Sequence, residues 1–155
     1  MALQTVFLLL LVVLAIGTVQ GWDGNIAYDF SHEFEGSRYF ISRYPEPFDL
    51  AKMNRRCKAY GGYLVQIDSF IEFRYLKFEA NRRADPSLVY TGITDLGSEG
   101  RFYNYNDKKP AAYLTWKRGQ PDNWAGKEHC VHITRWGFND IGCDGNGRYM
   151  CEVKV

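Results

Sequence analysis

The sequence has almost no excess of charge of either sign, since 19 Lys and Arg side chains are balanced by 18 Asp and Glu, for a formal charge of +1. A protein that binds nucleic acid or an acidic membrane surface through electrostatics needs a basic excess, so this balance argues against both kinds of partner. Repeats, low-complexity stretches and heptad patterns are also lacking. With 46% apolar and 16% aromatic residues, the composition indicates a globular domain rather than a disordered chain.

No apolar run is long enough to cross a membrane, which takes about 20 residues. The longest run covers residues 6–16 and has 11 residues, which is typical of the apolar part of a signal peptide. No Lys or Arg precedes it, but Val19-Gln20-Gly21 offers small residues at a cleavage point. We predict a signal peptide over residues 1–21 and therefore a secreted, extracellular protein with no membrane span. The alternative is a buried first strand.

Cysteine is scarce, with four in the chain, and the four do not form pairs of C-x-x-C clips, which argues against a structural zinc site. An even number in a secreted chain indicates two disulfides, with three possible pairings. Spacing alone does not choose among them. The four are Cys57, Cys130, Cys143 and Cys151.

Two helices are expected in the first half of the chain. Asp49 is an N-cap candidate, and apolar residues at helical spacing follow until Gly61-Gly62 ends the helix. The stretch from Ser69 to Glu72 is a capping box that opens a second helix. Asp85-Pro86 is expected to end that helix.

Short strands are expected elsewhere, and residues 22–36, without clear periodicity, are predicted to be a loose amino-terminal segment before a domain over residues 37–155. Residues 104–127 form a long polar loop that contains Trp116 and Trp124, and loops of this length are usually functional or disordered. The fold class is therefore α+β, with a small antiparallel sheet. The expected strands cover residues 37–42, 63–67, 88–93, 102–103, 130–134 and 149–152.

Oxygen-bearing side chains concentrate between residues 120 and 140. Three carboxylates and two amides are hard oxygen donors, which suit Ca²⁺ and its six to eight oxygen ligands. A cis bond before Pro121 would turn the two flanking side chains to one side. The alternative is that this stretch is an ordinary surface turn without a metal. The predicted calcium ligands are Gln120, Asp122, Glu128, Asn139 and Asp140.

Histidine and carboxylate side chains in this half of the chain offer two other chemistries. His129 and His132 could form a metal clip, but in a strand they would point to opposite faces. An enzyme would use Asp95 with Glu99, or Asp122 with Glu128, as an acid/base pair. The chain has no nucleophile elbow, phosphate loop or metalloprotease helix motif, so we predict that it is not an enzyme.

A set of motifs occurs in a fixed order along most of the chain: Cys57, Gly61-Gly62, Leu64, Ser69, Glu72, Thr91-Gly92-Ile93-Thr94-Asp95, Glu99-Gly100, Trp116, Gln120-Pro121-Asp122, Glu128, Cys130, Asn139-Asp140, Cys143 and Cys151-Glu152. In the order and spacing of these motifs, the chain resembles a C-type lectin domain from about Arg38 to Glu152. Phe138 stands where that family usually has Trp, and Tyr90-Thr91 replaces Trp-Ile.

The resemblance implies the disulfides Cys57–Cys151 and Cys130–Cys143, a double-loop α+β fold and a principal Ca²⁺ site on the long loop. Some relatives have a second Ca²⁺ site, which would map to Asp95, Glu99, Asn123 and Glu128. Asn123 and His129 replace carboxylates often found there. Asp95 and Glu99 could equally be residues that order the loop by hydrogen bonding.

The resemblance also implies sugar binding through the principal site, by the five ligands together with Trp124. Gln120 before Pro121 and Asp122 after it resemble the galactose-type order, and Trp124 could stack on the C–H face of that sugar. The expected partners are galactose-type glycans, including N-acetylgalactosamine, on microbial or cell surfaces in innate immunity, or a glycoprotein receptor. Oligomers could raise avidity. The alternative is a C-type lectin-like module that binds a protein or lipid.

Overall fold

A computed structural model describes residues 26–83 and 88–155. The predicted signal peptide, residues 22–25 and the expected helix stop at Asp85-Pro86 lie outside the described residues. The helices and strands are β1 (Ile26–Phe34), β2 (Ser37–Ser42), β3 (Glu46–Pro47), α2 (Leu50–Ala59), β4 (Tyr63–Leu64), α3 (Phe70–Arg83), β5 (Val89–Thr94), β6 (Tyr103–Asn104), the short 3-10 helix η2 (Trp124–Gly126), β7 (Cys130–Thr134), β8 (Gly137–Ile141) and β9 (Asn146–Lys154).

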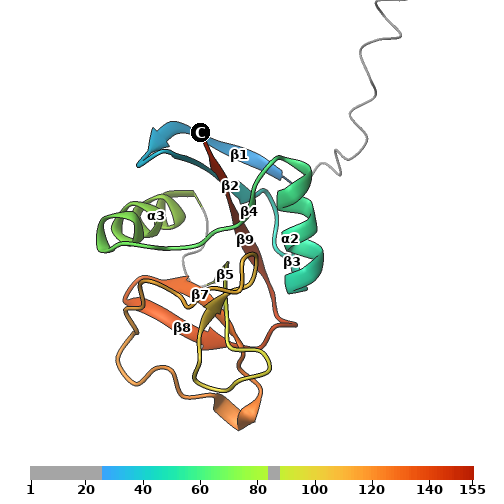
Figure 1. Ribbon diagram of the computed structural model, residues 1–155, viewed down its shortest axis with the longest axis vertical. Helices are drawn as coiled ribbons and strands as arrows, with labels where there is room; N and C mark the ends of the chain where they lie inside the picture. Colours follow the sequence, from blue (N-terminus) through green and yellow to red (C-terminus); the bar gives the residue numbers. More distant parts are fainter. Residues whose placement is uncertain (1–25, 84–87) are drawn as a thin grey trace, which may run out of the picture.

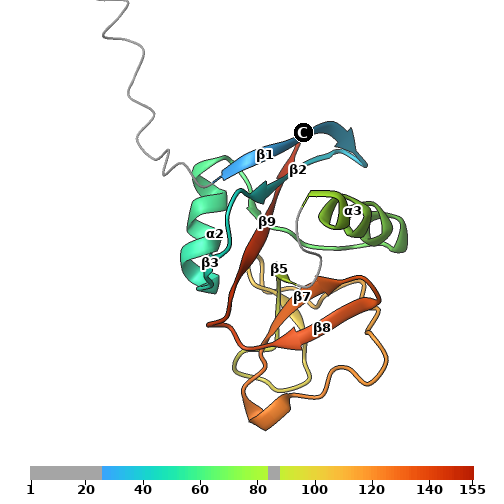
Figure 2. The ribbon, with the colours of Figure 1, turned by 180° about the vertical axis from the view of Figure 1, so that it is seen from behind.

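The strands join in the order β1-β2-β9-β5-β7-β8, with β3 and β4 paired to β9 and β6 paired to β5. Most neighbours are antiparallel, but β5 and β9 are parallel, so the sheet is mixed rather than antiparallel as predicted. The two helices lie on either side of β9, and the long loop lies at the end of the molecule away from β1 and β2 (Figures 1 and 2).

Both helices begin as their sequences predict. The Asp49 side chain accepts a hydrogen bond from the backbone N–H of Lys52 at 2.6 Å, which caps α2. The hydroxyl of Ser69 accepts one from the N–H of Glu72 at 3.0 Å, which caps α3. Glu72 does not close the reciprocal bond of a capping box. Its carboxylate instead accepts from the N–H of Asp68 and the hydroxyl of Tyr39, tying α3 to β2.

Each helix covers its own part of the hydrophobic core. The side chains of Phe73, Leu76 and Ala80 on α3 are buried in a cluster with residues of β2, β5, β7 and β8. Met53 and Cys57 on α2 are buried in a second cluster that includes Tyr90 and Tyr149. The predicted disulfides are confirmed: Cys57–Cys151 joins α2 to β9, and Cys130–Cys143 joins the start of β7 to the turn after β8.

Two sequence-based predictions about strands were wrong. Residues 26–34 of the predicted loose segment form β1, which pairs with β2 through a register with two irregularities. These irregularities interrupt the two-residue period, which is why the pattern was not visible. Residues 137–141, which none of the expected strands covered, form β8, paired with β7. Of the predicted strand 63–67, β4 covers Tyr63–Leu64.

Candidate calcium and glycan site

The middle of the long loop is attached to the edge strand β8. The backbone N–H of Lys117 donates to the carbonyl of Phe138, and the N–H of Phe138 donates to the carbonyl of Thr115, both at 2.8 Å. Gly137 makes this close approach possible, because a Cβ there would lie 2.6 Å from the backbone nitrogen of Lys117. The loop is therefore ordered by the same strand that carries Asn139 and Asp140.

Asp140 lies at the centre of the candidate site. Its side chain is buried on β8, and its two carboxylate oxygens accept hydrogen bonds from the backbone N–H groups of Asp122, at 3.2 Å, and Asn123, at 2.7 Å. The preceding Gln120–Pro121 bond is cis. One carboxylate thus holds the loop segment that follows Pro121 against the strand.

Glu128 closes the other side of the site. Its carboxylate accepts a hydrogen bond from the backbone N–H of Trp124 at 3.0 Å, and its own N–H donates to the side-chain oxygen of Asn123 at 3.1 Å. Carboxylate oxygens of Asp122, Glu128 and Asp140 lie within 4.8 Å of one another. Three negatively charged groups so close together repel unless a proton or a cation lies between them.

The electrostatics of Glu128 reflect this crowding. Burial raises the pKa of its carboxyl above the usual range, and the nearby carboxylates of Asp122 and Asp140 raise it further, although the N–H of Trp124 opposes the shift. The folded protein therefore binds this proton more tightly than the unfolded chain does. Without a cation, stability falls as the pH rises from the ordinary glutamate pKa through the raised one.

The two amides complete the group of predicted ligands. The side-chain oxygen of Gln120 is buried and has no hydrogen-bond donor among the described residues, which is costly unless a cation or water satisfies it. Asn139 uses its amide nitrogen to donate to the backbone carbonyl of Asp140, so its side-chain oxygen is the atom oriented for another partner. Three clustered carboxylates and an unsatisfied amide oxygen fit a hard cation such as Ca²⁺.

We expect Ca²⁺ to raise the melting temperature of the protein at neutral pH, because it binds the native state and relieves the repulsion at Glu128. Saturation to a hundredfold above Kd stabilises by about 2.7 kcal/mol, which corresponds to a rise of several degrees for a domain of this size. Differential scanning fluorimetry across a calcium titration measures it, with Mg²⁺ as the matched control. An unchanged melting temperature would count against the site.

Trp124 lies on the loop between the proposed ligands Asp122 and Glu128. Its side chain is 73% exposed, and with Gly126, Lys127 and Glu128 it lines a hollow of about 580 Å³ that also reaches the turn at Cys143. Glu128 is the one proposed ligand in the lining of this hollow. A large exposed aromatic beside polar groups is typical of a surface that binds a ligand with both apolar and polar faces. The predicted site residues Gln120, Asp122, Trp124, Glu128, Asn139 and Asp140 thus lie on the long loop and the neighbouring strand β8.

The predicted second group is arranged differently. Asn123 is engaged with Glu128, whereas Asp95 and Glu99 come together with His129, whose ring nitrogen Nδ1 lies 3.1 Å and 3.5 Å from their carboxylates. The sequence suggested His129 as half of a metal clip with His132 or as a replacement for a carboxylate, but not as a partner of Asp95 and Glu99. The signal that could have found the cluster was the position of His129 directly after Glu128. His129 and His132 do not form a metal clip, since the side chain of His132 is buried in β7.

The domain has a mixed sheet, two flanking helices, two disulfides and an ordered long loop that ends in an oxygen-rich cluster, and this is the C-type lectin fold. Residues 47–153 match the Lectin C-type domain family, and the chain belongs to this family. It is a family of carbohydrate-binding domains that are not enzymes. No helix among residues 26–83 and 88–155 is long and apolar enough to span a membrane.

Among its relatives, salivary C-type lectin 2 of Aedes albopictus is 32% identical over 111 residues, which are 63% of this chain and 72% of the relative. Asialoglycoprotein receptor 1 of Rattus norvegicus is 29% identical over 79% of this chain, but the match spans only 43% of that receptor. The carbohydrate-recognition domain of the mouse scavenger receptor C-type lectin is similar in structure, with a TM-score of 0.69 and 30% identity over 79% of this chain and 92% of that one.

Proposed function

We propose that the protein is a secreted lectin that binds galactose-type glycans through Ca²⁺ held by Gln120, Asp122, Glu128, Asn139 and Asp140. The observation that carries this proposal is the cluster of Asp122, Glu128 and Asp140 carboxylate oxygens within 4.8 Å of one another. The buried, unsatisfied oxygen of Gln120, two residues before Asp122, adds to it. A bound Ca²⁺ would be coordinated by two neighbouring sugar hydroxyls in place of water. The chain's own side chains then decide which pair of hydroxyls fits.

Gln120 and Asp122 supply different hydrogen bonds on the two sides of Pro121. The Gln120 side chain has an amide that donates as well as an oxygen that accepts, whereas the Asp122 carboxylate only accepts. This order of donor and acceptor supports galactose or N-acetylgalactosamine as the preferred sugar. The similarity to a receptor named for asialoglycoproteins is in keeping with it.

Secretion and assembly belong to the same proposal. The predicted signal peptide over residues 1–21 and the likeness to a lectin named as salivary support secretion. A single site binds a monosaccharide weakly, so clustered copies would be needed for useful avidity. A structural relative, the Kupffer cell receptor Clec4f, is described as trimeric, and it is 27% identical with a TM-score of 0.64. Microbial or cell-surface glycans recognised in innate immunity are the proposed partners.

Retention on immobilised galactose tests the proposal. We expect the protein to bind the column in Ca²⁺ and to elute with a chelator or with free galactose. The rival function, binding of a protein or lipid without sugar, predicts that the protein passes through the column under both conditions.

Trp124→Ala is expected to weaken galactose binding about fivefold, because ring stacking on the sugar contributes about 1 kcal/mol beyond area burial. Trp136→Ala is the matched control, since Trp136 is similarly exposed, at 71%, but lies in the turn between β7 and β8. Calorimetric titration of both variants with galactose measures the difference. Equal affinities for the two variants would contradict a stacking role.

A further inference from the structure

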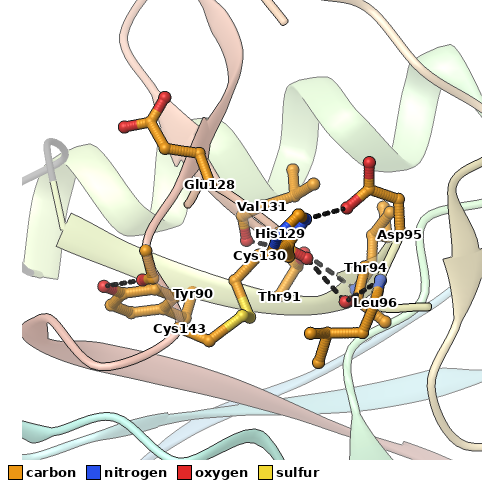
Figure 3. Close-up of a disulfide and its surroundings, with 12 residues drawn as sticks. Tyr90, Thr91, Thr94, Asp95, Leu96, Glu128, His129, Cys130, Val131 and Cys143 are labelled. Carbon is orange, nitrogen blue, oxygen red and sulfur yellow. Dashed lines mark hydrogen bonds and ion pairs between the residues drawn. A yellow bond between two sulfur atoms is a disulfide. The ribbon is translucent and has the colours of Figure 1, made fainter. Parts of the chain in front are cut away.

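A second group of ligand-type side chains lies near the base of the long loop, outside the proposed sugar site. It consists of Asp95 at the end of β5, Glu99 in the following turn and His129 just before β7. One ligand atom from each lies within 4.8 Å of the other two. Figure 3 shows the ring of His129 directed at Asp95, whereas the neighbouring Glu128 points away from this pair.

The surroundings fix these groups to different degrees. The side chain of Asp95 is 0% exposed, that of His129 is 30% exposed and that of Glu99 is 55% exposed. One Asp95 oxygen accepts the N–H of Gly100 at 2.7 Å, which orients the other oxygen toward His129. The backbone carbonyl of His129 is held by the N–H of Asp95 at 3.2 Å. The cluster is therefore built on a rigid strand end and opens to solvent on the side of Glu99.

This arrangement does not fit the second calcium site that the family resemblance implies. Of the four residues assigned to that site, Asn123 and Glu128 bond to each other and Glu128 also bonds to Trp124. What stands next to Asp95 and Glu99 is an imidazole nitrogen. Calcium prefers six to eight oxygen ligands, whereas imidazole is a ligand for zinc, copper and nickel.

We propose that Asp95, Glu99 and His129 bind a divalent transition-metal ion of the zinc class, in a site separate from that of Asp122, Glu128 and Asp140. Ligand atoms on a tetrahedral zinc ion at about 2.0–2.2 Å lie about 3.3–3.6 Å apart. The separations of His129 Nδ1 from Asp95 Oδ1 and Glu99 Oε2, 3.1 Å and 3.5 Å, are close to that spacing. Three protein ligands leave the fourth position to water.

The ion would join parts of the chain that are distant in sequence. Asp95 directly follows β5, and His129 follows directly after Glu128, a ligand of the proposed sugar site. A metal bound at His129 would fix the point from which Glu128 reaches into that site. The second ion therefore acts as a clamp on the end of the long loop.

Zinc binding to the folded protein in excess Ca²⁺ tests the proposal, because the calcium occupies the sugar site. Competition with a chromogenic zinc chelator should show one Zn²⁺ per chain, and Co²⁺ in its place should give a visible absorption band. His129→Ala and Glu99→Gln should each weaken zinc binding at least tenfold. Glu99 is partly exposed, so its variant keeps the test informative even if the His129 variant is unstable.

Two further variants separate this site from the sugar site. Asp122→Asn should keep the zinc affinity of the parent, because Asp122 belongs to the other cluster. His129→Asp, which makes the ligand set all oxygen, should lose zinc and bind a second Ca²⁺. The proposal is overturned if the parent binds no zinc in excess Ca²⁺, if Glu99→Gln binds it as the parent does, or if Asp122→Asn abolishes it. None of these results depends on sugar binding, so the proposed lectin function is tested separately.

Discussion

Asp140→Ala is expected to abolish calcium-dependent sugar binding while leaving the protein folded. The substitution removes one proposed cation ligand and the acceptor for the N–H groups of Asp122 and Asn123. Hydrogen bonds to a charged group contribute about 1.5–3 kcal/mol each to the stability of the folded loop. Losing both releases the segment that carries Asp122 in addition to removing a cation ligand, so no sugar binding should be detectable. Calorimetric titration with galactose measures the loss, and near-ultraviolet circular dichroism reports whether the fold persists.

Two further variants serve as controls for Asp140→Ala. Asp107→Ala removes an exposed carboxylate from the same long loop, where it bonds to the backbone of Lys109, and should leave sugar affinity at the parental value. Asp140→Asn keeps one oxygen but loses the charge, and should retain at most weak binding. A folded Asp140→Ala protein that still binds galactose in a calcium-dependent way would contradict the assigned role.

Exchanging the residues on either side of Pro121 is expected to change which sugar the protein prefers. The double variant Gln120→Glu, Asp122→Asn keeps the charge and the number of oxygens, so Ca²⁺ affinity should change little. Donors and acceptors trade places, and the preference should move from galactose, with its axial 4-hydroxyl, toward mannose, with an equatorial pair. A mispaired polar group costs about 1–3 kcal/mol, or roughly tenfold to a hundredfold in affinity.

Trp124 should limit the switch, because its exposed ring lies two residues after Asp122 and lines a hollow with Glu128, and we expect it to obstruct the mannose orientation. Adding Trp124→Ala to the double variant should therefore complete the change in preference. Competition of immobilised glycan by free galactose and free mannose gives the ratio. A double variant with the parental ratio would show that the order of Gln120 and Asp122 does not select the sugar.

The sequence predicted best those features that depend only on residues close together in the chain. The N-caps at Asp49 and Ser69 depend on neighbouring residues, and they were predicted correctly. The disulfide pairing could not be obtained from spacing, because it depends on how α2 packs against β9. It came from the family resemblance and is confirmed.

The parts that were not predicted depend on distant contacts. The polar Asn139 and Asp140 lie in β8 because this strand pairs with β7 and receives the long loop on its other side. The approach of His129 to Asp95 joins residues 34 positions apart, which no periodicity reveals. The ligand set of the principal site remains a prediction, supported by the placement of its carboxylates.

The most direct measurement of the central claim is binding of the purified protein to an array of glycans with and without Ca²⁺. The account predicts strong signals on terminal galactose and N-acetylgalactosamine in Ca²⁺, weak signals on mannose, and loss of all of them in a chelator. Glycan binding that is unaffected by the chelator, or no glycan binding by a protein that is correctly folded and calcium-loaded, would contradict it.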